Sequence, residues 1–337
     1  MHHCDLANEK QSHVCVLVEG HYHYGLGALA NSLASNNFSG TIWVGYRGAL
    51  PYWLNALEPV AEIENCWQVS PGVQMRFLLI ESSIPLVNYK PDFMLKLFSK
   101  FNLSHLFLMD ADIIVKKDWG FFSEWIEHGV ALFEDFLSPR SPHHLSRAKW
   151  KKIHESDFPE VRTLDIYVNS GFVGIKREYI ALIENWKKFQ ELATFNIQGL
   201  EQSIVMAKSR SEYRKRSPHH LLYFDQDSLN AVLTTVHAPV SVLDRFAMGL
   251  FCDGEVLCHG LDSPKPWELS AFLRVTGLWR LVQWTKLAHF YSYYKVYFQH
   301  VSSPIPLYRR HPTACILKMH SKVAAVSDVS DMSEVEA

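Results

Sequence analysis

Three familiar signatures are missing from this sequence, and each absence narrows the class of protein. No uncharged apolar run reaches about 18 residues, which argues against a membrane-spanning helix. The six cysteines lie far apart without a C-x-x-C pair, which argues against a disulfide framework or a zinc cluster. The N-terminus is polar and has no apolar signal core. We therefore expect a cytoplasmic protein with reduced cysteines.

The composition is that of a globular protein with a substantial core. The chain has 337 residues, of which 48% are hydrophobic and 13% aromatic. This length can hold one large α/β domain with appendages or two small domains. The formal charge of −2 gives no reason to expect nucleic acid as a partner.

The most informative stretch is LFLMDADIIV, at residues 106–115. A short apolar run of this kind predicts a strand buried on both faces, as in a parallel sheet. A buried carboxylate is costly unless it is paired or binds a metal. Asp110 and Asp112 could therefore turn toward a hard divalent cation where the strand ends. The alternative is that they cap the following loop.

The chain before this stretch alternates predicted strands and helices, which favours a mainly parallel sheet. The first strand, at 14–18, ends in a loop rich in glycine and aromatics. That loop belongs at the carboxyl edge of the sheet, where ligands bind. Tyr22 or Tyr24 could stack on a nucleobase there, or merely pack. The loop is not G-x-G-x-x-G, so a dinucleotide fingerprint is absent.

Further strands are predicted at 41–46 and within 73–80, and helices are predicted at 26–33, 92–101 and 177–192. The basic stretch at 138–154 is either a solvated loop and helix or a flap over an anionic ligand.

Three more polar islands interrupt apolar sequence downstream. Asn169-Ser170-Gly171 lies within a strand-like run, where such residues mark a bulge or a close approach by a ligand. Asp225-Gln226-Asp227 precedes a predicted helix and could simply cap it. His259 is followed six residues later by Lys265. Two acids and a neutral imidazole are suitable ligands for Mn²⁺, and the lysine could neutralise a diphosphate.

The order of these motifs resembles the glycogenin-like retaining glycosyltransferases, glycosyltransferase family 8, which include bacterial lipooligosaccharide galactosyltransferases. The motifs are Asp-x-Asp, Asn-Ser-Gly, Asp-Gln-x-x-Leu-Asn and His-x5-Lys-Pro-Trp, and the resemblance covers residues 14–267. Gly260 and Asp262 stand where the family usually has an aromatic residue and a glycine. The basic stretch at 208–220 lengthens the interval before Asp225.

The resemblance implies a fold, an activity and a set of site residues. The implied fold is α/β: the GT-A nucleotide-diphospho-sugar transferase fold, a mixed, mainly parallel sheet flanked by helices, with a C-terminal helical extension. The implied activity moves a sugar from a nucleotide-diphosphate donor, commonly a UDP-sugar, to an unidentified glycan, lipid or protein acceptor. Mn²⁺ or Mg²⁺ would be held by Asp110, Asp112 and His259. Asn169, Asp225 and Gln226 would be catalytic. The implied donor-binding residues are Tyr22, Tyr24, Lys90, Ala111, Ser170, Gly171, Asp227, Gly260 and Lys265.

Retention of configuration requires either a covalent intermediate or attack from the face that the diphosphate leaves. Asp225 and Asp227 are the nearest candidate carboxylates for a nucleophile. The resemblance favours same-face attack, with the diphosphate accepting the proton.

The predicted organisation has four parts. A polar tail spans 1–12, the catalytic domain spans 13–267, an aromatic helical extension spans 268–317, and a disordered tail spans 318–337. The aromatic face within 268–300 either packs on the domain or makes a peripheral contact with a membrane or partner.

Two other hypotheses stay open from the sequence. One is a phosphatase-like hydrolase with Asp110 as its nucleophile, although that motif normally comes early in its domain. The other is a non-catalytic binding or scaffold protein that keeps the fold, as the altered loop after His259 would allow.

Overall fold

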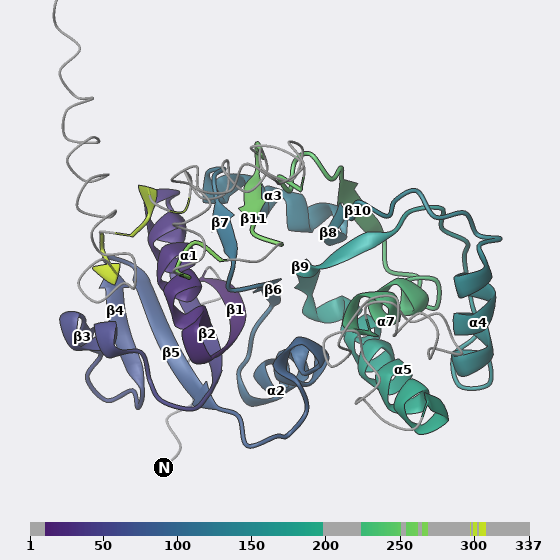
Figure 1. Ribbon diagram of the computed structural model, residues 1–337, viewed down its shortest axis with the longest axis horizontal. Coiled ribbons are helices and arrows are strands. Elements are labelled where there is room, and N and C mark those ends of the chain that lie inside the picture. Colours follow the sequence, from purple (N-terminus) through teal and green to yellow (C-terminus); the bar gives the residue numbers. More distant parts are fainter. Residues whose placement is uncertain are drawn as a thin grey trace, which may run out of the picture.

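A nine-stranded mixed sheet forms the centre of the molecule (Figure 1). The structure is a computed structural model that describes residues 11–197, 224–250, 254–261, 265–268, 297, 299–301 and 303–307. The strand order is β10-β8-β9-β6-β1-β2-β5-β4-β3. A separate two-stranded sheet pairs β7 with β11. The expected mixed α/β architecture is therefore confirmed.

The strands are β1 Ser12–Glu19, β2 Gly40–Arg47, β3 Glu58–Pro59, β4 Cys66–Ser70, β5 Val73–Leu79, β6 His105–Met109, β7 Ile113–Val115, β8 Val130–Glu134, β9 Val168–Lys176, β10 Val240–Leu243 and β11 Leu257–His259. The helices used below are α1 His23–Ser35, α2 Lys90–Lys100, α3 Trp119–Trp125, α4 Leu145–His154, α5 Ala181–Ile197 and α7 Phe224–Val232. The predicted strands and helices in the first hundred residues are all present, with ends shifted by a few residues. The short strands β3, β4, β8 and β10 were not predicted.

The centre of the sheet is parallel, and one strand reverses it. β6, β1, β2 and β5 run parallel to one another, which places their carboxyl ends at one edge. β9 runs antiparallel between β6 and β8. Because of that reversal, the amino-terminal half of β9 reaches the same edge as the carboxyl ends of β6 and β8. The Asn169-Ser170-Gly171 motif lies in that half.

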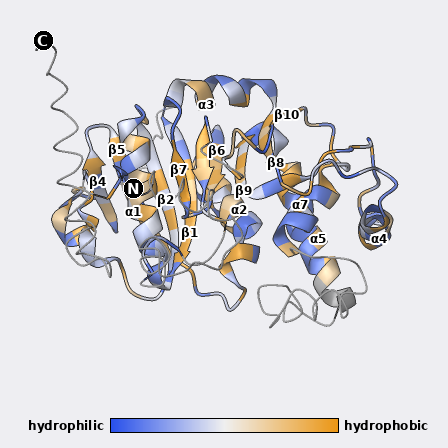
Figure 2. Cartoon of the chain, turned by 45° about the horizontal axis from the view of Figure 1, so that its top comes forward, coloured by the Kyte–Doolittle hydropathy of each residue, from blue (hydrophilic) through white to orange (hydrophobic). Residues whose placement is uncertain are grey.

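Helices cover both faces of the sheet, and strand side chains alternate between the two cores. Val14 and Val16 of β1 face the core that includes α1 and α3, and Cys15 faces the core that includes α2, α5 and α7. In β6, Phe107 faces the core with α1 and α3, and Leu108 faces the core with α2, α5 and α7. Figure 2 shows the central strands in hydrophobic colours. Burial on both faces explains why these strands are apolar runs without alternation.

The strand predicted within 106–115 ends at the aspartates, as expected, and the residues after them form a second short strand. β6 ends at Met109, and Ile113 begins β7, which belongs to the other sheet. The amide of Ile113 donates to the carbonyl of Asp110 at 3.1 Å, which closes a tight turn between the two strands. A continuous strand would carry the carboxylates into the apolar layers, and the turn brings them to the edge of the sheet.

A C-terminal segment packs on α1. The side-chain amide of Asn31, which is fully buried, donates to the carbonyls of His300 and Ile305. Its oxygen accepts from the Ile305 amide at 2.8 Å. Leu307 lies against Gly27 of the same helix. Part of the predicted C-terminal extension is thus fastened to the helix that follows the β1 loop.

None of the helices in the described part of the chain is long and apolar enough to cross a membrane. The predicted tail at 318–337, the basic stretch at 208–220 and nearly all of the aromatic segment at 268–300 lie outside the described residues.

Replacing Asn31 with alanine tests the attachment of this segment. Asn31→Ala leaves one buried amide and two carbonyls without partners, so we expect the free energy of unfolding to fall by about 1–3 kcal/mol. Urea unfolding measures the change. Asn55→Ala, at an exposed position, is the control and should leave the stability as it is. Equal stability of the two variants would show that the C-terminal segment contributes nothing through Asn31.

Candidate active site

The turn between β6 and β7 places Asp110, Ala111 and Asp112 at the carboxyl edge of the parallel strands. The Asp110 amide donates to the carbonyl of Gly171 on β9 at 2.8 Å, which fixes the turn to the neighbouring strand. The Asp112 side chain is buried, and that of Asp110 is 30% exposed. Strand pairing therefore holds the two carboxylates at a defined edge of the sheet. Aspartates that only cap a loop would not need this pairing.

His259 joins the two aspartates through the small second sheet. Antiparallel pairing of β11 with β7 sets His259 opposite Ile113, directly after the Asp-x-Asp turn. Its Nε2 lies 3.3 Å from Oδ1 of Asp112 and 3.8 Å from Oδ2 of Asp110. One ligand atom from each of the three residues lies within 4.8 Å of the others. The set fits a divalent metal that prefers oxygen and imidazole ligands.

Gly171 leaves the space that the His259 side chain occupies beside β9 and Asp110. A Cβ at this position would lie 2.5 Å from Cε1 of His259 and 3.0 Å from Oδ2 of Asp110. Only glycine leaves room for the imidazole against the strand. The sequence analysis expected a bulge or a close approach by a ligand at the Asn-Ser-Gly motif. In the structure, the group that lies close to Gly171 is the His259 side chain.

Lys90 links Asp110 to Asp225. Its buried Nζ lies 2.9 Å from Oδ1 of Asp110 and 3.1 Å from Oδ2 of Asp225, and it donates to the carbonyl of Ser170. Burial alone would lower the pKa of Lys90, but the two carboxylates outweigh it and raise the pKa above its ordinary value. Lys90 is therefore a permanent positive charge at the centre of the site.

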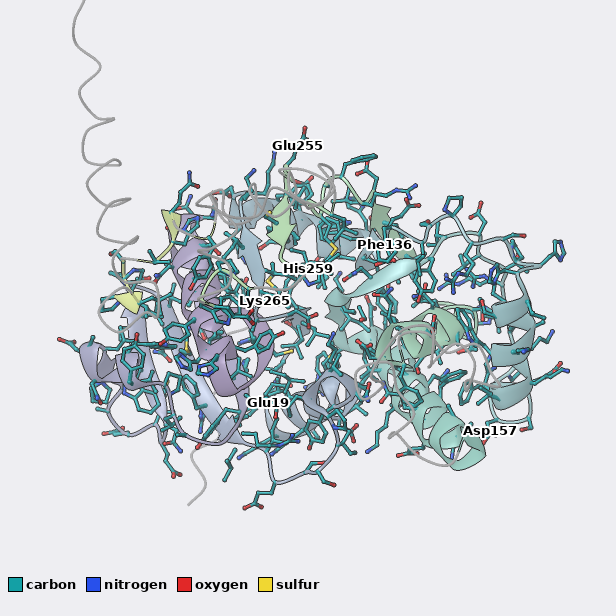
Figure 3. All side chains as sticks on the ribbon, viewed as in Figure 1. Glu19, Phe136, Asp157, Glu255, His259 and Lys265 are labelled. Carbon is teal, nitrogen blue, oxygen red and sulfur yellow. The ribbon has the colours of Figure 1, made fainter. Side chains whose placement is uncertain are left out.

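Lys265 makes a similar pair with Asp112. Its Nζ lies 2.6 Å from Oδ2 of Asp112 and also donates to the carbonyl of Gly260. Burial would raise the pKa of Asp112, but Lys265 and His259 lower it well below its usual range. Burial likewise opposes the charge on Lys265, and Asp112 raises its pKa. Both groups are charged at neutral pH. His259 and Lys265 lie close together near the middle of the molecule in Figure 3.

The first turn of α7 meets the Asn-Ser-Gly motif. Ser170 Oγ donates to Oδ2 of Asp225 at 2.6 Å, and the Ser170 amide donates to Oε1 of Gln226 at 3.2 Å. Asn169 accepts from the amide of Gly171 through its own side-chain oxygen. The sequence motifs at 169–171 and 225–226, separated by more than fifty residues, thus form one polar layer.

Asp135 is a site residue that the sequence analysis missed. It is buried directly after β8, and its Oδ2 accepts from Nδ2 of Asn169 at 2.9 Å. Burial raises the pKa of Asp135, against the hydrogen bonds from Asn169 and the Leu137 amide. The available signal was the pair of acids that follows the apolar run VALF, a pattern similar to the one that drew attention to Asp110.

Asp227 and the basic stretch have partners of their own. Asp227 is fully buried, accepts from the hydroxyl of Tyr167 at 2.6 Å and lies 3.5 Å from Nη1 of Arg140. Arg140 and Arg147 are buried, so the interpretation of 138–154 as a solvated loop and helix holds only for part of the stretch. The reason is that Asp227 needs a buried cation, which composition alone does not indicate. These contacts anchor the start of α7.

A cavity of about 260 Å³ opens beside the Asp-x-Asp turn. It is lined by Leu17, Glu19, Tyr22, Pro85, Leu86, Val87, Lys90, Asp110, Ala111 and Asp112. Its rim is held by Arg47, which contacts Glu19 at 3.0 Å and donates to the carbonyl of Ile84.

The two tyrosines of the β1 loop have different positions. Tyr22 is 41% exposed, lines the cavity and meets Trp267 edge to face. Tyr24 is 6% exposed and packs against His23 and Tyr52. Tyr22 is thus the tyrosine available to a ligand in the cavity.

Comparison with known proteins gives likeness of fold only. No family model matches the chain, and no curated protein matches it in sequence. Similar solved structures include the bifunctional glycosyltransferase WbbM (13% identity, TM-score 0.48, covering 92% of this chain and 51% of that one). Another is the galactosyltransferase LgtC in complex with donor and acceptor sugar analogues (13% identity, TM-score 0.45, covering 86% of this chain and 97% of that one). A third is the glycosyltransferase GlyE of Streptococcus pneumoniae TIGR4 (13% identity, TM-score 0.44, covering 82% of this chain and 63% of that one). The chain spans about half of WbbM. A function for it therefore has to come from the geometry of its site.

Replacing Gly171 with alanine tests the metal centre. The added methyl group would displace His259, so we expect Mn²⁺ affinity to fall at least tenfold, measured by calorimetry with UDP present. The matched control is Gly174→Ala on the same strand, whose methyl would instead meet the Phe107 ring at 2.8 Å. Both variants should lose stability through overpacking, by about 1–3 kcal/mol. Equal Mn²⁺ affinity in the two variants would contradict the placement of His259 as a ligand.

Proposed function

We propose that this protein is a metal-dependent retaining glycosyltransferase that transfers a sugar from a nucleoside diphosphate donor, most simply a UDP-sugar. The observation that carries the proposal is the convergence of Asp110, Asp112 and His259 on one point, with Lys265 beside them. A site where a sugar leaves a charged diphosphate needs such a concentration of cationic and metal-binding groups.

Asp110, Asp112 and His259 would hold Mn²⁺ or Mg²⁺. The bound ion would supply Lewis-acid stabilisation of the charge that develops on the leaving diphosphate. Lys265 would add a positive charge on the same side. The cavity beside Asp112 would take the nucleoside, with the base against Tyr22 and within reach of Glu19.

The polar layer of Asn169, Asp225 and Gln226, with Asp135 behind it, would face the donor sugar. The carboxylate and amide groups are suited to sugar hydroxyls and to positive charge at the anomeric carbon. Asp225 is held by Lys90 and Ser170 on its Oδ2. An ion-paired carboxylate with a strong hydrogen bond is a weakened nucleophile. Asp227 is engaged by Tyr167 and Arg140 away from this layer.

These contacts favour same-face attack over a covalent intermediate. The bond between the anomeric carbon and the diphosphate oxygen would break as the acceptor oxygen bonds to the same face of the sugar. The proton of the acceptor hydroxyl would pass to the departing phosphate oxygen. Lys90 would keep Asp225 in place through both events. The acceptor, and the contact of 268–300 with a membrane, stay predictions.

The phosphatase hypothesis has less support from this geometry. A nucleophilic Asp110 needs one carboxylate oxygen open toward the substrate phosphorus. Lys90 lies within 3.2 Å of both oxygens of Asp110, and His259 lies beside Oδ2. The Asp110 carboxylate therefore has the surroundings of a metal ligand.

A thermal-shift screen of nucleotide sugars with and without Mn²⁺ tests the proposal. A donor at a hundredfold excess over its dissociation constant should stabilise the native state by about 2.7 kcal/mol, and only when metal is present. Asp110→Ala and His259→Ala should abolish the shift and donor hydrolysis. Asp157→Ala, at an exposed position, is the control.

Two outcomes would contradict the proposal. A shift that survives EDTA and both variants would remove the metal from donor binding. Metal-dependent binding of the donor without hydrolysis or transfer, across the whole panel, would favour the scaffold hypothesis.

A further inference from the structure

Each of the two metal-binding carboxylates is shared between His259 and a buried lysine. In Asp112, Oδ1 faces His259 at 3.3 Å and Oδ2 faces Lys265 at 2.6 Å. In Asp110, Oδ2 lies 3.8 Å from His259, and Lys90 lies 2.9 Å from Oδ1 and 3.2 Å from Oδ2. Each of the two ammonium groups is therefore paired with a carboxylate that would bind the metal.

The two lysines differ in how firmly they are held. Lys90 is fixed by carboxylates from two segments and by the carbonyl of Ser170. Within the described residues, Lys265 has hydrogen bonds to Asp112 and to the carbonyl of Gly260. Its ammonium also lies 5.9 Å from the centre of the Tyr22 ring, which lines the cavity. Lys265 is thus the lysine that can exchange one anionic partner for another at the cavity.

The charge on Lys265 opposes a metal ion at the same carboxylate. An ammonium 2.6 Å from Asp112 neutralises the charge that attracts a divalent cation, and both groups are screened little because they are buried. A group that hydrogen-bonds to a ligating carboxylate changes the affinity of that carboxylate for the metal. A diphosphate in the cavity would compete with Asp112 for the same ammonium.

We infer that Lys265 is a positioning residue that couples the binding of the metal to the binding of the nucleoside diphosphate. In the absence of nucleotide, Lys265 pairs with Asp112 and keeps the affinity for divalent cations low. When the diphosphate binds, Lys265 turns to it and releases Asp112 to the metal, so the two ligands bind cooperatively. This inference rests on the proposed function and specifies how its site is loaded.

Titration with Mn²⁺, followed by the EPR signal of the free ion, tests the coupling with and without UDP. Without UDP, Lys265→Met should bind Mn²⁺ at least tenfold more tightly than the wild type. The increase in Mn²⁺ affinity that UDP produces should shrink toward none. Lys265→Arg keeps the charge and should behave like the wild type. Lys187→Met removes a surface lysine paired with Asp92 and is the control for the loss of one charge.

The outcomes separate this inference from the proposed function. If Lys265→Met binds UDP weakly and binds Mn²⁺ alone no better than the wild type, Lys265 is only a diphosphate ligand and the inference is wrong. If the wild type binds neither Mn²⁺ nor UDP, the proposed function itself fails. Circular dichroism checks that Lys265→Met is folded. Lys265→Gln, which keeps a hydrogen-bond donor, replaces it in the same titration if it is not.

Discussion

The placement of two aspartates at the end of an apolar strand constrains the rest of this structure. A carboxylate in a layer buried on both faces is strongly unfavourable unless it is charge-paired or bound to a cation. The chain meets this constraint by breaking the strand at Asp110 and bringing a lysine to each carboxylate. The break also frees β7 to pair with β11, and that pairing delivers His259. The geometry of the candidate metal site thus follows from the way the strand ends.

Topology then gathers residues that are remote in sequence. The antiparallel strand β9 carries its Asn-Ser-Gly motif to the edge where the parallel strands end. Buried pairing of Asp227 with Arg140 and Tyr167 fixes the first turn of α7, so that Asp225 meets Ser170 and Lys90. The result is a candidate metal site on one side of Lys90 and a polar layer on the other. Charge, rather than apolar packing, joins the two halves of the site.

Much of this arrangement could be predicted from the sequence, because each polar island interrupts an apolar run. The central strands, the α/β architecture and the Asp-x-Asp motif are visible as local patterns. The second strand at 113–115 could not be predicted, because its partner, β11, lies far along the chain. The roles of Asp135 and the buried Arg140 could not be predicted for another reason. Their roles depend on Asn169 and Asp227, partners that only the folded chain brings near.

The most direct test of the central claim is anomalous diffraction from crystals grown with Mn²⁺ and UDP. We expect one strong peak within coordination distance of Asp110, Asp112 and His259, with the diphosphate beside it and Lys265 turned toward the phosphate oxygens. A bound nucleotide with no anomalous peak at these three residues, or a peak elsewhere, would contradict the account.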